Sequence, residues 1–377
     1  MKIKVLVCAG TRPEIIKLAP LIKELKRWPE LFSVRLCATG QHREMFSLAC
    51  LDFDIIPDIS LEIMTPNQTL SSLCSLLFQK LDAIFLAEKP DLILIQGDTT
   101  TVMVATICAF FQNIPVGHVE AGLRSFDLRA PFPEEMNRRV ASIAAEFHFC
   151  PTESARQNLL REGFNDSNVY VTGNTVIDAL LMTIEKIRKT RLPLPPAISN
   201  VLGIDRKMVL ITGHRRENFG EGFRNIFEAI VRLSEKHPDV IFVYPVHLNP
   251  NVQESARQSL CNRPGVVLID PLPYTDFVHM MDRSYLILSD SGGVQEEAPS
   301  LGKPVLVMRD VTERPDGVQA GTSILVGTNT EKIIYEVDRL LMDKQYYINI
   351  AKIQNPFGDG KASQCIVDIL KRNFFQR

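Results

Sequence analysis

The stretch VLVCAGTRPEIIKLAPLIKEL, residues 5–25, shows the pattern that recurs along the chain. It begins as an apolar run, turns at Gly10 and continues with apolar residues at helical spacing. A strand that leads directly into a helix is the repeating unit of a parallel α/β sheet. The start of the helix also carries two cations, Arg12 and Lys17, although the helix dipole disfavours positive charge there. We therefore expect an anion to bind at this turn.

Strand-like runs alternate with helical patterns through most of the 377 residues. Several runs, such as DLILIQ at 91–96, are apolar on both faces, which is typical of a parallel sheet covered by helices on both sides. A proline-rich segment at 190–200 separates two series of such runs and is the expected linker. The pattern predicts an α/β protein with two Rossmann-like, doubly wound domains that share a central cleft. Ligands of such sheets bind at the carboxyl ends of the strands.

Composition narrows the classes of function. The chain is 45% hydrophobic and 23% charged with a formal net charge of −2, so no global basic field favours nucleic acid. The N-terminus lacks the plan of a signal peptide, and we expect no run of transmembrane length and no membrane partner. Eight cysteines without a C-x-x-C pair indicate buried thiols in a reducing cytoplasm. Neither a close pair of histidine ligands nor a complete dinucleotide fingerprint is present, so we expect no metal and no external cofactor.

Three carboxylates stand at strand or helix ends of the first domain. Asp98 follows the run LILIQG, Glu120 directly follows an expected strand, and Glu134 begins a helix after Pro133. Each carboxylate alone has a structural explanation, as a helix cap or as a favourable charge near a helix start. Three of them in one domain are more typical of catalysis, because carboxylates with different pKa values can divide acid and base work.

Two polar loops in the second half also follow strands. The stretch GHRREN places His214 between a glycine and two arginines, which favours a functional site over the structural role that a lone histidine usually has. The stretch SDSGGVQEE places Ser291, Gly292 and Gly293 at a helix start, where small residues let backbone N–H groups approach a phosphate. Glu297 lies about one helical turn further on and could bind ribose hydroxyls; an ordinary glycine-rich turn is the alternative.

Taken in order, the motifs resemble a known family over essentially the whole chain. They are GTRPEIIK, TGQH, QGDTTT, HVEAGLRS, PEEMNR, GNTVID, GHRREN and SDSGGVQEEAPSLGKPVLVMRDVTERPDG. The sequence resembles the non-hydrolysing UDP-N-acetylglucosamine 2-epimerases. The resemblance implies a GT-B type architecture, a homodimer, and no external cofactor. It also implies domains at 1–172 and 173–357, with a last helix at about 358–377 that packs back on the first.

The resemblance implies reversible epimerisation at C2 between UDP-GlcNAc and UDP-ManNAc, which feeds cell-surface polysaccharide synthesis. UDP leaves C1 to give a 2-acetamidoglucal and then adds back. The implied catalytic residues are Asp98, Glu120, Glu134 and His214, with the division between acid and base left open. The implied substrate-binding residues are Arg12, Lys17, Phe277, Ser291, Gly292, Gly293, Glu297 and Arg314. The two cations of the opening stretch would then neutralise charge on the substrate and on departing UDP.

Some bacterial members of the family hold a second UDP-GlcNAc beside the substrate as an activator. The residues that resemble that pocket are Gln41, His42, Gln68, Arg215 and His247. The run MTPNQTL departs slightly from the usual pattern before Gln68.

The residues leave other functions open. A GT-B glycosyltransferase that uses UDP-GlcNAc would share the glycine-rich loop and Glu297, but it would not explain the three carboxylates together with GHRREN. A hydrolysing epimerase would release ManNAc and UDP, and its members lack the GHRREN form. A nucleotide-sugar sensor would have no need of acid and base groups. A related UDP-sugar with other substituents at C3 and C6 is a further alternative substrate.

Overall fold

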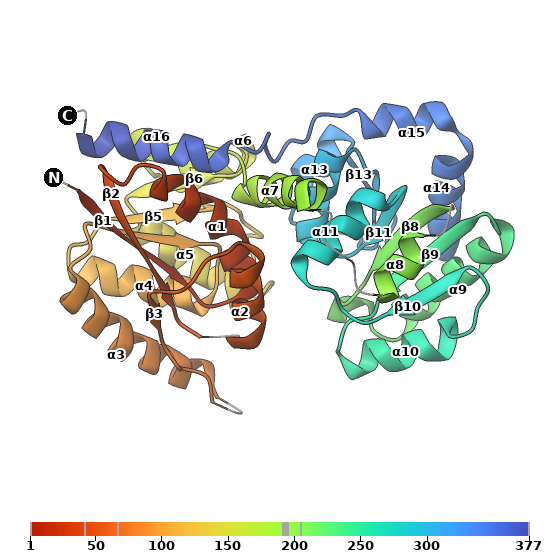
Figure 1. The fold of residues 1–377 in the computed structure, drawn as a ribbon, viewed down its shortest axis with the longest axis horizontal. Helices are drawn as coiled ribbons and strands as arrows, with labels where there is room; N and C mark the ends of the chain where they lie inside the picture. The colour runs from red at the N-terminus through yellow and green to blue at the C-terminus, as the bar shows by residue number, and fades with distance from the viewer. Residues whose placement is uncertain (1, 41–42, 66–67, 191–195, 204–205, 376–377) are drawn as a thin grey trace. The chain divides into compact units, whose positions relative to one another are not determined.

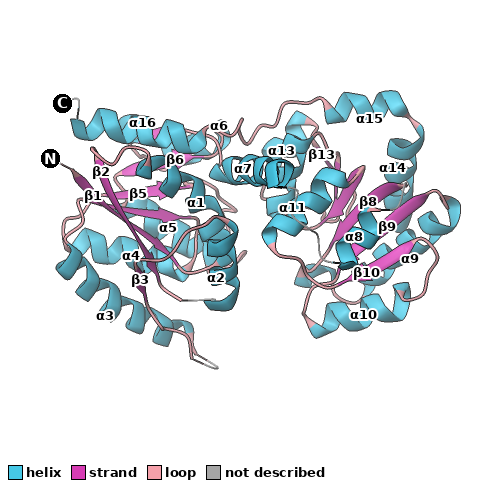
Figure 2. Ribbon diagram, viewed as in Figure 1, coloured by secondary structure: helices cyan, strands magenta, loops and turns pink. Residues whose placement is uncertain are grey.

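The chain divides into two compact units. The computed structural model describes residues 2–40, 43–65, 68–190, 196–203 and 206–375. Unit 1 comprises Met1–Met182 and Phe357–Arg377, and unit 2 comprises Thr183–Pro356. Strands of each unit gather in one sheet with helices around it (Figure 2), and the C-terminal helix, blue in Figure 1, lies beside the red N-terminal strands. Part of the linker expected at 190–200 lies outside the described residues.

Unit 1 is built on a parallel sheet of seven strands in the order β3-β2-β1-β4-β5-β6-β7. The order reverses between β1 and β4, which is the switch point of a doubly wound fold. The strands are β1 (Ile3–Ala9), β2 (Phe32–Ala38), β3 (Ile59–Ser60), β4 (Leu92–Gln96), β5 (Val116–Val119), β6 (Phe147–Cys150) and β7 (Val169–Val171).

Helices follow the strands of unit 1 and cover its sheet. They are α1 (Arg12–Lys26), α2 (Arg43–Asp52), α3 (Leu70–Glu88), α4 (Thr100–Phe111), α5 (Glu134–Ala144), α6 (Glu153–Arg161) and α16 (Ala362–Phe375). Helix α7 (Thr175–Thr190) begins in unit 1 and ends in unit 2. Helix α1 begins at a capping box formed by Thr11 and Glu14, with Pro13 in its first turn. Helix α16 packs against α1. The Asp178 carboxylate accepts hydrogen bonds from the first two backbone N–H groups of α16, those of Ala362 and Ser363.

Helix α3 is long and apolar enough to cross a membrane by length and composition alone, contrary to the expectation from the sequence. One stripe of apolar side chains, spaced four residues apart, is buried in the core of unit 1; these are Leu73, Leu77, Leu81 and Phe85. Lys80 and Asp82 are exposed between them. The helix therefore covers the sheet with one face, as the amphipathic helices of an α/β fold do.

Unit 2 repeats the design with a parallel sheet in the order β10-β9-β8-β11-β12-β13. Its strands are β8 (Lys207–Thr212), β9 (Val240–Pro245), β10 (Val266–Ile269), β11 (Leu286–Ser289), β12 (Val305–Val307) and β13 (Ser323–Leu325). Its helices are α8 (Pro196–Leu202), α9 (Glu221–Lys236), α10 (Pro250–Leu260), α11 (Tyr274–Arg283), α12 (Gly292–Glu297), α13 (Pro315–Ala320), α14 (Thr330–Met342) and α15 (Lys344–Ala351).

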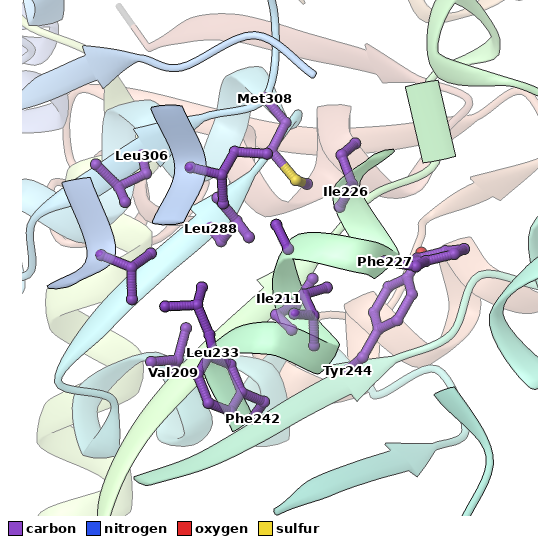
Figure 3. Close-up of a cluster of buried hydrophobic side chains, with 14 of the residues drawn as sticks. Val209, Ile211, Ile226, Phe227, Leu233, Phe242, Tyr244, Leu288, Leu306 and Met308 are labelled. Atoms are coloured by element: carbon purple, nitrogen blue, oxygen red, sulfur yellow. The ribbon is translucent and has the colours of Figure 1, made fainter. Parts of the chain in front are cut away.

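The core of unit 2 lies between its sheet and the helices α9, α10 and α14. Val209 and Ile211 of β8 meet Phe227 and Leu233 of α9 in one buried cluster, with Phe242 from the neighbouring strand (Figure 3). All five side chains are almost fully buried. Packing in this core fixes the position of β8 and of the loop that follows it. The prediction of two doubly wound parallel sheets is confirmed, and the cleft expected between them stays a prediction.

Candidate active site

The first polar cluster lies where β1 and β5 of unit 1 end. Glu120 directly follows β5 and pairs with the ammonium group of Lys17, one turn into α1. Asn174 also donates to the same carboxylate oxygen through Nδ2, at 3.0 Å. Glu120 has a φ of 65°, in the left-handed region that a non-glycine residue seldom adopts. The backbone therefore turns this carboxylate toward a cation and an amide in a largely buried position.

Asp98 lies next to this cluster because β4 and β5 pair, with Gln96 opposite Val119. Its carboxylate pairs with the guanidinium group of Arg138 on α5, and its backbone oxygen accepts a hydrogen bond from Asn137 Nδ2 at 2.9 Å. The Arg138 side chain is almost fully buried, so Asp98 pairs with a cation that is itself shielded from water. The structure thus brings two of the three predicted carboxylates to neighbouring strand ends, each beside a cation.

Glu14 joins the loops that carry these groups. Its buried carboxylate accepts hydrogen bonds from the backbone N–H groups of Gly10 and Thr11, at 3.0 and 2.7 Å. It also accepts one from Thr99 Oγ1 at 2.8 Å, and Thr99 directly follows Asp98. Burial raises the pKa of Glu14 to about 7, although these hydrogen bonds act in the opposite direction. One carboxylate therefore ties the loop after β1 to the loop after β4.

His118 of β5 supports the same edge from inside the sheet. Its ring is fully buried, and Nε2 lies 2.7 Å from the backbone oxygen of Gly97. Burial lowers the pKa of His118 to about 4, so the ring is neutral near pH 7. A neutral ring that donates from Nε2 fixes the Gly97 carbonyl, directly before Asp98.

The remaining predicted residues of unit 1 are placed more openly. Glu134 is the first residue of α5 and half-buried, and among the described residues its carboxylate has no hydrogen-bonding partner. Arg12 is the first residue of α1 and also half-buried. Gln68 precedes α3 and is half-buried. Gln41 and His42 lie outside the described residues.

In unit 2, the GHRREN loop follows β8. The imidazole of His214 stacks on that of His247, with the ring centroids 5.2 Å apart. The backbone N–H groups of His214 and Arg215 both donate to the carboxylate of Asp290, at 2.9 Å. Burial lowers the pKa of His214, while the charge of Asp290 acts in the opposite direction. Two residues predicted for regulation, Arg215 and His247, therefore lie beside the predicted catalytic histidine.

The glycine-rich loop follows β11 and leads into α12. Arg314 lies over Gly292, where an added Cβ would be 3.4 Å from the guanidinium carbon. This arginine is held by Glu296, which accepts a hydrogen bond from its Nε at 2.6 Å. An added Cβ at Gly293 would lie 3.7 Å from a carboxylate oxygen of Glu297. The structure therefore brings the predicted diphosphate loop, the predicted ribose carboxylate and the predicted arginine together.

Helix α11 approaches the same loop. Tyr274, its first residue, donates a hydrogen bond from its hydroxyl to Glu297 at 2.6 Å. Phe277 stands one turn further along and is half-buried. Tyr274 orients the carboxylate that is predicted to bind ribose. Phe277 places an aromatic ring on the same helix as Tyr274.

Several residues of the site were missed by sequence reasoning. They hold the predicted groups in place and are Glu14, His118, Arg138, Asn174, Tyr274 and Asp290. All of them except Tyr274 stand inside the motifs quoted above, such as PEEMNR and GNTVID. The sequence signal for these residues was therefore their place in the quoted motifs. Those motifs contain more polar residues without an assigned role than with one.

The fold and these two clusters define a two-domain α/β protein with polar loops at the carboxyl ends of both sheets, and comparison with known proteins identifies its family. The family model described as UDP-N-acetylglucosamine 2-epimerase matches residues 23–371. The chain is 50% identical to the UDP-N-acetylglucosamine 2-epimerase of Escherichia coli (strain K12) over 376 residues, which covers 98% of this chain and 99% of that protein.

Solved structures give the same result. The UDP-GlcNAc 2-epimerase of Neisseria meningitidis, solved bound to UDP-GlcNAc, is 47% identical with a TM-score of 0.92, over 98% of this chain and 100% of that one. The enzyme of Methanocaldococcus jannaschii, solved in complex with UDP-GlcNAc and UDP, is 34% identical with a TM-score of 0.80, over 98% and 99% of the two chains. The chain belongs to the UDP-N-acetylglucosamine 2-epimerase family.

The burial of Glu14 predicts a specific dependence of stability on pH. Its folded pKa of about 7 lies above the ordinary value of 4.5, so the folded state holds this proton more tightly than the unfolded state. The stabilisation of the folded state by this proton is complete below about pH 4.5 and is lost as the pH rises through 7. One proton changes the free energy of unfolding by up to about 1.4 kcal/mol per pH unit in that window. We expect Glu14→Gln to remove this slope.

The measurement is urea unfolding at pH 5, 6, 7 and 8, followed by fluorescence. The single tryptophan, Trp28, lies at the end of α1, so its emission reports on unit 1. Glu235→Gln, an exposed site on α9 of unit 2, is the matched control and should leave the slope unchanged. Equal slopes in the wild type and in Glu14→Gln would show that Glu14 does not titrate in this window.

Proposed function

We propose that this protein is a non-hydrolysing epimerase that interconverts UDP-GlcNAc and UDP-ManNAc. The observation that carries the proposal is the pair of carboxylates at neighbouring strand ends, Glu120 beside Lys17 and Asp98 beside Arg138. Inversion at C2 needs one group to remove a proton and another to return a proton from the opposite face. Two or three carboxylates in one unit, each held by its own partner, can supply these two groups. A glycosyltransferase or a sensor has no need of them.

The proposed reaction has two halves. A carboxylate takes the proton from C2, the electrons of the C–H bond form a double bond between C1 and C2, and the C1–O bond breaks with its electrons passing to UDP. The 2-acetamidoglucal then takes a proton at the other face of C2, while an oxygen of the UDP β-phosphate bonds to C1. Asp98, Glu120 and Glu134 are the proposed acid and base groups. Lys17 and Arg12 supply positive charge near the departing diphosphate.

Unit 2 is the proposed UDP-binding unit. Ser291, Gly292 and Gly293 offer backbone N–H groups without side chains in the way, and Arg314 stands over that loop with its charge held by Glu296. Glu297 is proposed to bind the ribose hydroxyls, and Phe277 is proposed to pack on uracil. The solved relatives bound to UDP-GlcNAc and to UDP support a UDP-sugar as the ligand. A cytoplasmic location and a role in cell-surface polysaccharide synthesis belong to the same proposal.

The deciding experiment is incubation with UDP-GlcNAc alone in D2O, followed by proton NMR. We expect UDP-ManNAc that carries deuterium at C2, formed without added NAD or metal. Free ManNAc and UDP would instead identify a hydrolysing epimerase. Product that keeps full protium at C2 would rule out elimination and re-addition, and turnover that requires an acceptor would identify a glycosyltransferase.

The same assay tests the carboxylates. Asp98→Asn, Glu120→Gln and Glu134→Gln keep the size of each side chain and remove its acid or base function. We expect kcat to fall about 10²–10⁴-fold, the usual range for a lost general acid or base, while UDP still binds by calorimetry. Near-normal turnover in all three variants would show that these residues act only as helix caps or surface residues.

A second UDP-GlcNAc is the proposed activator, held in part by Arg215 and His247. The stacking of His247 on His214 supports this, because a ligand that orders His247 also acts on the ring beside it. We expect sigmoidal dependence of the forward rate on UDP-GlcNAc, and a reverse reaction from UDP-ManNAc that stays slow until a trace of UDP-GlcNAc is added. His247→Ala should make the forward curve hyperbolic. A hyperbolic wild type without a reverse lag would show that no activator operates.

The protein is also proposed to act as a homodimer through helices α3, α4 and α5. Helix α3 packs against α4 and α4 packs against α5, and large apolar side chains stay exposed on these helices, namely Leu86, Phe110, Phe111 and Ile143. A face of this kind on a globular unit is typical of a protein interface. Sedimentation velocity should give a dimer for the wild type and a monomer for Phe111→Glu; Tyr335→Glu, exposed in unit 2, is the control. A monomeric wild type would overturn this proposal.

A further inference from the structure

Asp290 is a buried carboxylate at the end of β11, directly before the glycine-rich loop. Its side chain is 0% exposed. One oxygen, Oδ2, accepts hydrogen bonds from the backbone N–H groups of His214 and Arg215 and from Nδ2 of Asn218, the last at 3.2 Å. Three donors on a single oxygen suit a carboxylate, which only accepts hydrogen bonds when ionised. A negative charge is thus held at the centre of the GHRREN loop.

The other oxygen, Oδ1, is buried and receives no hydrogen bond from the described part of the chain. Nδ1 of His214 lies 3.3 Å from Oδ1 and can supply one. Leaving a buried carboxylate oxygen without a donor is costly, so a proton on Nδ1 is strongly favoured. The protonation state of one ring nitrogen decides what the other nitrogen can do.

We propose that Asp290 is a positioning residue for His214, which it holds in the tautomer with the proton on Nδ1 and with Nε2 free for the substrate. The position fits this role, because the His214 side chain is 39% exposed while its Nδ1 lies 3.3 Å from the buried carboxylate. The same carboxylate fixes the backbone of the loop through two N–H groups, so ring and loop are oriented together. The part that His214 plays in turnover rests on the proposed function, whereas the tautomer does not.

The charged and titratable groups around the ring come from three segments. Asp290 follows β11, Tyr244 and His247 belong to β9 and the loop after it, and Arg215 shares the loop of His214. The Tyr244 hydroxyl donates to the backbone oxygen of Gly213 and does not compete for the ring. His247 and Arg215 both disfavour a charged imidazole, and burial does so most strongly. Asp290 is thus the single group among these that stabilises the imidazolium form.

This arrangement suits the departure of UDP. A proton taken from solvent by the free Nε2 turns the ring into an imidazolium, whose Nε2–H can donate a hydrogen bond to the negative charge that grows on the β-phosphate as the C1–O bond breaks. The charge of Asp290 compensates the imidazolium that carries this proton, which is the part that a buried aspartate plays beside a catalytic histidine in other enzymes. When UDP adds back to C1, this charge declines and Nε2 returns its proton to solvent, which restores the neutral tautomer and closes the cycle.

The test is Asp290→Asn in the full chain, with Asp338→Asn as a matched control. In unit 2, Asp338 Oδ1 lies 2.6 Å from Nε2 of His237, another aspartate–histidine pair, located before the amino end of β9 and so at the opposite edge of the sheet. Long-range ¹H–¹⁵N spectra of ¹⁵N-histidine protein give the tautomer and pKa of each ring. The signal of His214 is assigned by its loss in His214→Asn.

We expect wild-type His214 to carry its neutral-form proton on Nδ1. In Asp290→Asn the proton should move to Nε2, the pKa of His214 should fall further, and kcat should drop about 10²-fold with a much smaller change in KM. Asp338→Asn should change none of these. A neutral wild-type ring protonated on Nε2 overturns the proposal even if Asp290→Asn fails to fold. An unchanged tautomer with kcat equal to the control also overturns it. A tautomer shift in a protein that does not epimerise UDP-GlcNAc would uphold the positioning role and refute the proposed function.

Discussion

A parallel sheet brings the carboxyl ends of all its strands to one edge, and this constraint places the polar clusters of both units. In unit 1, β1, β4 and β5 are direct neighbours, so the loops that follow them meet although 80 residues or more separate the first from the second in sequence. In unit 2, β8 and β11 are neighbours, and Asp290 therefore reaches the loop that carries His214. The fold supplies proximity, and side chains need only short local adjustments to make contact.

Burial then decides which side chains must accompany the predicted catalytic ones. Glu120, Asp98 and Asp290 are carboxylates in sites that are partly or fully shielded from water, and each is accompanied by a cation, an amide or backbone N–H groups. A shielded charge without such partners would be costly. The motifs quoted above are therefore longer than a list of the predicted catalytic residues, because they also contain residues that hold them.

The sheets were predictable from sequence because strands buried on both faces read as continuous apolar runs, such as DLILIQ. The two-residue strand β3 was not, because it is defined by pairing with β2 and has no pattern of its own. The catalytic role of Asp98 and Glu120 stays a prediction, but their positions just after strands could be anticipated. Their partners could not, because the contacts span large separations: Arg138 lies 40 residues from Asp98, and Asn174 lies 54 residues from Glu120. Nor does sequence reveal the left-handed backbone at Glu120.

Helix α16 has a consequence for the order in which the protein is made. Unit 1 contains the first residues of the chain and also the last, since Phe357 is buried against Val176 and Ile177 and α16 covers α1. Unit 2, by contrast, is one continuous segment, Thr183–Pro356. A ribosome that reads from the N-terminus therefore finishes unit 2 while unit 1 still lacks a helix. The half that begins synthesis first is the half that completes its core last, and until then the apolar surface of α1 that α16 covers stays open to water and to chaperones.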